Sequence, residues 1–198
     1  MSVIDTLTTW CHEQMALRNW PLAPLKALGG DAGFRQYFRI ASEPRLLAVY
    51  SPPATEPNAQ FCAIAEHWRG ARVCAPKIYA KDLTQGFMLI EDFGEKALAD
   101  ELAQNSPQAA YAPVLAVLAK LQALDAPNGL YPAYDREKLT LEMSLMPEWF
   151  MGKLLGIEPS AQDLALLQQL FDGLTDAALA QPQVIVHRDY HCRNIHLL

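Results

Sequence analysis

The sequence predicts an α+β protein of two lobes: an N-terminal lobe with an antiparallel sheet and a packed helix, and a C-terminal lobe that is mainly helical and incomplete. Three observations favour this fold class. Short runs of β-branched and aromatic residues, bounded by turn residues, recur up to about residue 90. One amphipathic helical pattern separates the third run from the fourth. After Gly94 the apolar spacing is helical, so we expect residues 1–93 and 94–198 to form the two lobes.

Each element of the N-terminal lobe follows from spacing and turn chemistry. Residues 2–18 repeat apolar side chains at helical intervals. The segment "LKALGGDAGFRQYFRI" places a glycine-containing loop between two short strands, and "RLLAVYSPP" predicts a third strand that its prolines end. Residues 58–72 return to the helical period. The segments "APKIYAKD" and "GFMLIEDFG" then predict a strand pair joined by a turn at residues 84–86.

Two long helices and one short strand are predicted in the C-terminal lobe. Ser106 and Pro107 begin the first helix. Ser160 begins the second, with Asp163 three residues further on as in a capping box. Residues 184–186 are β-branched and predict a short buried strand. The predicted buried faces of the two helices consist of Val114, Val117, Leu118, Leu121 and Leu124, and of Leu164, Leu167, Phe171 and Leu174.

Composition excludes several classes of partner. The net charge is -6 and the pI is about 5.3, without a cluster of Lys or Arg, so we expect neither a nucleic-acid nor a membrane partner. The four cysteines form no CxxC pair, which is typical of free thiols in a reducing compartment. No stretch approaches the roughly 18 apolar residues of a membrane span. We therefore expect a cytoplasmic protein, of open oligomeric state.

The segment "HRDYHCRN", residues 187–194, carries the chemistry. A carboxylate and an amide five residues apart on one loop suit phosphoryl transfer. The reaction needs a base or orienting group for the attacking hydroxyl and an oxygen ligand for magnesium. Asp189 fits the first role and Asn194 the second. His187 is expected to support the loop, and the two arginines of the segment either contact phosphate or pair with nearby carboxylates.

Zinc is an alternative for the same segment. His187, His191, Cys192 and His196 lie within ten residues. Their spacing matches no closed four-ligand pattern, and on a strand and loop the side chains need not converge. We therefore favour phosphoryl transfer.

The loop "HRDYHCRN" resembles the HxDxxxxN catalytic loop of the protein-kinase-like superfamily, in its aminoglycoside phosphotransferase and choline kinase family. The segments "GDAGFRQYFRI", "GFMLIEDFG" and "YPAYDREKLTLEMSLMPEWF" extend the resemblance over nearly the whole chain. Together they resemble the bacterial kinases of the anomeric hydroxyl of N-acetylmuramate and N-acetylglucosamine. The resemblance implies ATP and Mg²⁺ as cofactors, a small-molecule sugar substrate, and a role in the recycling of cell-wall sugars.

The resemblance also assigns binding residues. A loop of small residues would cover the nucleotide phosphates, Arg35 or Arg39 would contact them, and backbone groups between the lobes would hold the adenine edge. Glu148 and Trp149 are candidates for the sugar, with Glu142 as an alternative acceptor of hydroxyl hydrogen bonds. In the same segment Met143 and Met146 are expected in the core. The residues assigned to the nucleotide are Gly30, Asp31, Ala32, Gly33, Arg35, Glu91, Asp92 and Phe93.

Two departures from the family pattern affect these expectations. Tyr50 stands where the third strand of protein kinases carries a lysine, so Glu66 on the following helix lacks that partner. The family continues after HxDxxxxN to a magnesium-binding aspartate, whereas this chain ends at "IHLL". We therefore expect a chain truncated after the catalytic loop and inactive by itself. The alternative function is that of a degenerate kinase relic, acting as a nucleotide-binding or interaction module.

Overall fold

The computed structural model describes residues 2–29 and 33–198. The chain divides into two compact units: a first unit of Met1–Ala126 with Ile185–Leu198, and a second unit of Pro127–Val184. The functional boundary at Gly94 between two lobes stays a prediction. Among the described residues, no helix is long and apolar enough to cross a membrane.

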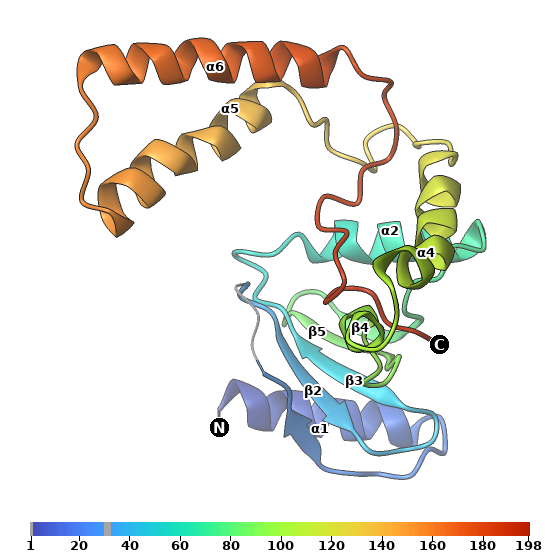
Figure 1. Cartoon of the computed structure of the whole chain (residues 1–198). Helices are drawn as coiled ribbons and strands as arrows, with labels where there is room; N and C mark the ends of the chain where they lie inside the picture. The colour runs from blue at the N-terminus through green and yellow to red at the C-terminus, as the bar shows by residue number, and fades with distance from the viewer. Residues whose placement is uncertain (1, 30–32) are drawn as a thin grey trace. The chain divides into compact units, whose positions relative to one another are not determined.

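The first unit is built on a five-stranded antiparallel sheet (Figure 1). The strand order is β1-β2-β3-β5-β4, so β3 lies in the middle. All five predicted strands are confirmed, and each pairs antiparallel with its neighbours. The strands are β1 (Leu25–Ala27), β2 (Gln36–Ile40), β3 (Leu46–Tyr50), β4 (Ile78–Asp82) and β5 (Phe87–Glu91).

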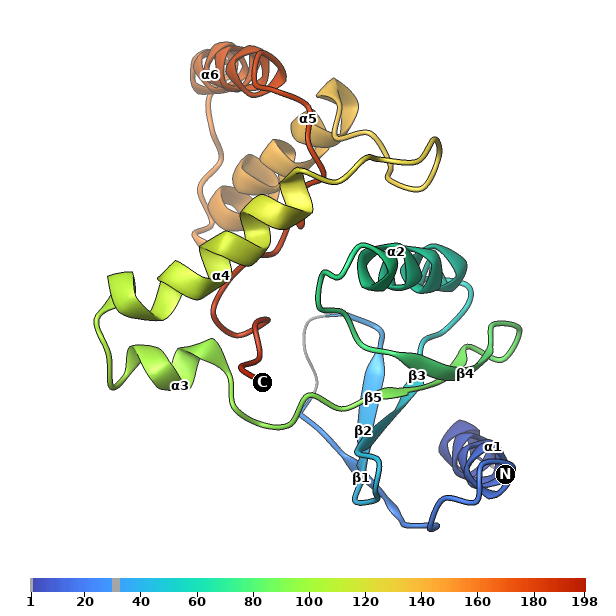
Figure 2. The same cartoon turned by 90° about the vertical axis from the view of Figure 1, so that its right-hand side faces the viewer.

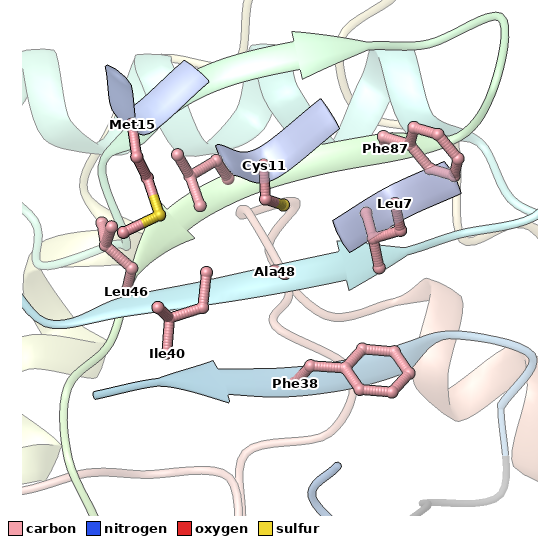
Figure 3. Packing of buried hydrophobic residues seen from close by; sticks show 9 residues of the cluster. Leu7, Cys11, Met15, Phe38, Ile40, Leu46, Ala48 and Phe87 are labelled. Carbon is pink, nitrogen blue, oxygen red and sulfur yellow. The ribbon is translucent and has the colours of Figure 1, made fainter. Parts of the chain in front are cut away.

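The predicted N-terminal helix, α1 (Val3–Ala16), covers one face of this sheet (Figure 3). It begins with a capping box, in which the Ser2 hydroxyl accepts from the backbone N–H of Asp5. Its apolar stripe, Leu7, Cys11 and Met15, is fully buried against strand residues that include Ile40. Burial raises the pKa of the Cys11 thiol to about 12, so this cysteine acts as an apolar core residue.

The second predicted helix, α2 (Asn58–Gly70), covers the opposite face (Figure 2). Successive side chains of a strand point to opposite faces of the sheet. Accordingly, Phe87 and Leu89 of β5 pack with α1, whereas Met88 and Ile90 pack with α2. Strand β5 is therefore buried on both sides, as its continuous apolar sequence requires.

Glycine is required at the turn that precedes β5. Gly86 has a φ of +74°, and a Cβ atom there would lie 2.1 Å from the carbonyl oxygen of Ser51. The backbone N–H of Ser51 also donates to the Gly86 carbonyl over 2.7 Å. This close approach fixes the end of β3, and with it the position of the buried Ser51 side chain.

The last residues of the chain attach to the start of α3 (Leu98–Leu102), a short helix that the sequence analysis missed. The Leu98 N–H donates to the Ile195 carbonyl over 2.8 Å, and the Leu197 N–H donates to the Lys96 carbonyl over 2.9 Å. The predicted helix α4 (Pro107–Gln122) follows, capped by Ser106. Together, α3 and α4 bury Leu98 and Val114 against the terminal segment.

The second unit is helical. It contains α5 (Arg136–Leu145), a π-helix η1 (Met146–Leu154), and α6 (Ala161–Leu179). The predicted capping box at Ser160 begins α6. An ion pair between Arg136 and Asp176 joins α5 to α6.

Several apolar residues of the second unit are more exposed than predicted. Leu164 and Leu174 of α6 are 47% and 51% exposed, and Met146 of η1 is 40% exposed. The prediction of core positions is wrong for these three residues. The reason is geometric: a pair of helices without a third layer cannot enclose an apolar face on both sides. Leu167, Phe171 and Met143 are half-buried.

The predicted strand at residues 184–186 is also wrong. Ile185 is buried, but Val184 and Val186 are 43% and 50% exposed, and the segment has no strand conformation. A run of β-branched residues becomes a strand when a neighbouring strand accepts its hydrogen bonds. No described strand pairs with this segment.

Replacing Leu89 by Ala should lower the free energy of unfolding by about 2–5 kcal/mol, because the side chain is fully buried between β5 and α1. Urea denaturation of the chain measures the change. The matched control is Leu22→Ala, at a side chain that is 57% exposed. An equal loss of stability in the two variants would contradict the assigned core.

Candidate active site

The loop at residues 187–194 folds back on itself through local turns. Arg188 has a left-handed φ of 72°, a conformation that non-glycine residues seldom adopt and that often marks functional loops. The His191 N–H then donates to the Asp189 carbonyl, and the Asn194 N–H donates to the His191 carbonyl. These turns bring residues 189 and 194 together although five positions separate them.

The Asp189 carboxylate is held at both oxygens. The Asn194 Nδ2 atom donates to Asp189 Oδ2 over 2.5 Å and to the Asp189 carbonyl over 3.1 Å. On the other side, His191 Nε2 lies 3.2 Å from Asp189 Oδ1. The Asp189 side chain is nevertheless 67% exposed, so a substrate hydroxyl can reach the carboxylate.

His187 holds the loop against helix α2. Its ring stacks on Trp68 with centroids 5.8 Å apart, and it meets the Tyr190 ring edge-on at 5.1 Å. Burial lowers the pKa of His187; Asp189 raises it and His191 lowers it further, as smaller effects. The buried Nδ1 atom has no hydrogen-bond partner among the described residues. The neutral form is therefore favoured.

Tyr190 fixes the loop to α4. Its hydroxyl donates to the Val114 carbonyl over 2.5 Å, and burial raises its pKa. The Ala99 N–H donates to the Cys192 carbonyl over 3.1 Å. Two side chains thus attach the loop to α2 and α4, and a backbone hydrogen bond attaches it to α3, while the carboxylate stays accessible.

The side chains of Glu91 and Asp92 have structural partners. Glu91 Oε2 accepts from the Lys77 N–H and from Arg69 of α2. Asp92, whose side chain is 3% exposed, pairs with Arg39 over 2.6 Å and accepts from the Gly94 N–H. The hydrogen bond that Arg39 donates to Asp92 raises the pKa of the guanidinium. Of the two arginines proposed for phosphate, Arg39 is therefore already bound.

Phe93 differs from these two neighbours. Neither its backbone N–H nor its carbonyl takes part in a hydrogen bond among the described residues. An unpaired donor and acceptor side by side on an extended segment are what an adenine edge requires. Backbone contact at the connection between β5 and α3 is thus feasible at Phe93.

Three of the assigned phosphate-loop residues, Gly30, Asp31 and Ala32, lie outside the described residues. Gly33 is exposed, and a Cβ atom there would meet nothing closer than 4.0 Å. Arg35, two residues further on, points to the α2 side, where its Nε donates to Ser51 Oγ over 3.0 Å. A guanidinium therefore lies beside the glycine-containing segment.

Tyr50 does not replace the lysine of the family pattern in space. Its ring packs on Phe87 with centroids 6.1 Å apart, within the cluster that α1 covers. A lysine in this role would have to face the following helix, α2. Tyr50 faces α1, and the residue that faces α2 at this end of β3 is Ser51. Glu66 of α2 pairs with Lys81 over 3.1 Å at the surface.

The residues assigned to the sugar lie in the second unit. Glu148 and Trp149 are neighbours in the π-helix η1 and both are exposed, Trp149 to 56%. π-Helical turns are rare, and those within α-helices frequently occur at functional sites. Glu142, the alternative, accepts a hydrogen bond from the Tyr134 hydroxyl within the same unit.

The zinc alternative finds no support in the geometry of the described residues. There, no three His, Cys, Asp or Glu side chains come together as a metal site. His187 contacts Trp68, His191 contacts Asp189, and Cys192 belongs to the cluster of α3 and α4.

Sequence reasoning missed Trp68, Glu56 and the role of His191 beside Asp189. Their partners lie on other elements or within an irregular loop, so periodicity gave no signal for them.

Comparison with known proteins agrees with this loop. Residues 24–198 match the profile of the phosphotransferase enzyme family. The chain belongs to this family. It is similar to N-acetylmuramate/N-acetylglucosamine kinases of Pseudomonas aeruginosa, at 38% identity over 89% of the chain, and of Neisseria meningitidis, at 32% over 94%. The chain spans 52% and 59% of the length of these relatives.

Solved structures of phosphotransferases share the fold. An aminoglycoside phosphotransferase, APH(2″)-IIa, in a ternary complex with streptomycin and ATP, matches 95% of the chain and 66% of its own length, with a TM-score of 0.62 and 12% identity. A choline/ethanolamine kinase family protein from Mesorhizobium loti matches 94% of the chain and 60% of its own length, with a TM-score of 0.55 and 17% identity. The predicted kinase-like fold is confirmed.

The pKa of His187 predicts a pH-dependent stability. Because burial lowers this pKa in the folded state, the unfolded chain binds more protons as the pH falls below about 6.5. The free energy of unfolding should therefore decrease from pH 7.5 to pH 5.5, and His187→Asn should reduce that decrease. Urea denaturation at the two pH values is the measurement, with His196→Asn, at an exposed side chain, as control. The same pH dependence in His187→Asn and wild type would contradict the assignment.

Proposed function

We propose that the protein transfers the γ-phosphate of ATP to the anomeric hydroxyl of N-acetylmuramate or N-acetylglucosamine, in the recycling of cell-wall sugars. The observation that carries this proposal is the contact of Asp189 with Asn194 on an accessible loop. The names of the similar kinases support the acceptor. The free cysteines fit a reducing compartment, so a cytoplasmic reaction is part of the proposal.

Asp189 is proposed as the catalytic residue. Its carboxylate accepts the proton of the sugar hydroxyl as the hydroxyl oxygen forms a bond to the γ-phosphorus. The bond between that phosphorus and the bridging oxygen breaks, and ADP leaves. Asn194 and His191 fix both carboxylate oxygens, which orients the group before the substrate arrives.

Asn194 is proposed as a magnesium ligand. Its Nδ2 atom faces Asp189, and its Oδ1 atom has no partner among the described residues. A free amide oxygen beside a carboxylate fits a hard cation that prefers oxygen ligands. When bound, the ion would neutralise charge on the nucleotide phosphates.

The remaining assignments complete the proposed site. The backbone of Glu91, Asp92 and Phe93 holds the adenine edge, and Gly30, Asp31, Ala32, Gly33 and Arg35 are assigned to the phosphates. Glu148 and Trp149 of η1 contact the sugar, the first through hydroxyl hydrogen bonds and the second through its flat apolar face.

Isothermal titration of the chain with ATP tests nucleotide and magnesium binding. We expect ATP to bind, and to bind more tightly with Mg²⁺ present. Asn194→Ala should remove most of the gain from Mg²⁺, because the neutral oxygen ligand is lost. The matched control is Asn105→Ala, which removes an exposed amide bonded to Glu101. An equal gain from Mg²⁺ in wild type and Asn194→Ala would contradict the metal assignment.

Turnover tests the role of Asp189. Because the chain spans about half the length of its relatives, the assay uses a chimera in which this chain replaces the matched part of the Pseudomonas aeruginosa kinase. Asp189→Asn should lower turnover on N-acetylmuramate by at least about a hundredfold and leave ATP affinity nearly unchanged, because the amide accepts no proton. Asp172→Asn, at an exposed residue of α6, is the control. Turnover near the wild-type rate in Asp189→Asn would contradict the proposed role.

A further inference from the structure

Arg35 is held from three sides on the α2 face of the sheet. Its NH2 group pairs with Glu56 Oε2 over 3.1 Å, its Nε donates to Ser51 Oγ over 3.0 Å, and its guanidinium carbon lies 4.5 Å from the centroid of the Phe61 ring. The Arg35 and Glu56 side chains are 21% and 16% exposed. This pair is therefore shielded from solvent, where its attraction is stronger than at an open surface.

The partners of Arg35 are themselves fixed. Ser51 is fully buried, and its hydroxyl donates to Asn58 Oδ1 over 2.5 Å while it accepts from Arg35. Asn58 returns a bond from its Nδ2 to the Ser51 carbonyl over 2.7 Å. The first residue of α2 and the end of β3 thus form a rigid base under the guanidinium.

Arg35 also has unused donors. The Arg35 NH1 group makes no hydrogen bond or ion pair among the described residues. A guanidinium carries five N–H donors in a planar fork that suits phosphate oxygens. Arg39, by contrast, is occupied by Asp92, Glu95 and the Gly94 carbonyl.

We propose that Glu56 is a positioning residue which holds Arg35 for the nucleotide phosphates, so that Arg35 and Glu56 together replace the lysine–glutamate pair that Tyr50 and Glu66 do not form. This inference rests on the proposed nucleotide-binding function. Arg35 reaches the α2 face from the segment before β2, whereas the lysine of the family pattern would reach it from β3. The acidic partner also differs in position: Glu56 lies in the segment before α2, whereas the glutamate of the family pattern lies on the helix.

The test compares the binding of ATP and of adenosine, which lacks phosphates, by isothermal titration of the chain. Arg35→Met should weaken ATP binding by roughly tenfold or more, the size of a charge-assisted hydrogen bond, and should leave adenosine binding unchanged. Glu56→Ala should weaken ATP binding severalfold, again without an effect on adenosine. In the Arg35→Met background, Glu56→Ala should have no further effect, because Glu56 acts through Arg35.

A matched control separates this role from general stability. Glu66→Ala breaks an exposed ion pair on the same helix and should change neither affinity. If Glu56→Ala lowers the melting temperature, Glu56→Gln, which keeps the size of the side chain, takes its place. An unchanged ATP affinity in Glu56→Ala or Glu56→Gln, or an equal loss with and without Arg35, would overturn the inference while ATP binding by the wild type still stands. Failure of the wild type to bind ATP would overturn the proposed function as well.

Discussion

The burial of β3 and β5 on both faces is the constraint on which the first unit depends. Helix α1 covers one face and α2 the other, and alternate residues of β5 contribute to each cluster. A central strand buried on two sides cannot shift its register by one residue, because every apolar side chain would exchange faces. The positions of Ser51 at the end of β3 and of Phe93 just beyond β5 are therefore set by the core.

Helix α2 contacts two polar parts of the proposed site, Arg35 and the loop at residues 187–194. Phe61 and Trp68 are seven residues apart, a spacing that places both on one side of a helix. Phe61 lies under the Arg35 guanidinium, and Trp68 stacks on His187 of the loop at residues 187–194. Helix α2 thus positions both the Arg35 guanidinium, which is proposed to bind the phosphates, and the loop that carries Asp189. Neither of these two parts needs to contact the other directly.

The sequence predicted what local patterns determine. The five strands of the sheet, the buried stripe of α1 and the Ser160 cap each depend on neighbours in the chain, and the structure confirms them. The predicted strand at residues 184–186 was wrong because a strand also needs a partner. The Arg35–Glu56 pair was missed because its residues lie 21 positions apart on irregular segments. Tyr50 was compared with a lysine by its position at the end of the third strand, and that position does not reveal which face of the sheet the side chain occupies. Site residues in loops follow from tertiary contacts, which periodicity does not encode.

The five-residue spacing of Asp189 and Asn194 has a physical reason in the geometry of one amide group. The Asn194 Nδ2 atom donates to the carboxylate, so its Oδ1 atom is directed to a different partner by the planarity of the amide. In the proposed mechanism, the Asn194 side chain then orients the carboxylate that receives the proton and offers an oxygen to the magnesium ion. In Asn194→Asp, the new carboxylate would repel Asp189 across the present 2.5 Å contact. In Asn194→Ala, both the hydrogen bond to Asp189 and the oxygen for the cation would be lost. Asparagine supplies a donor for one neighbour and an acceptor for the other, which explains why the loop pairs a carboxylate with an amide rather than with a second carboxylate.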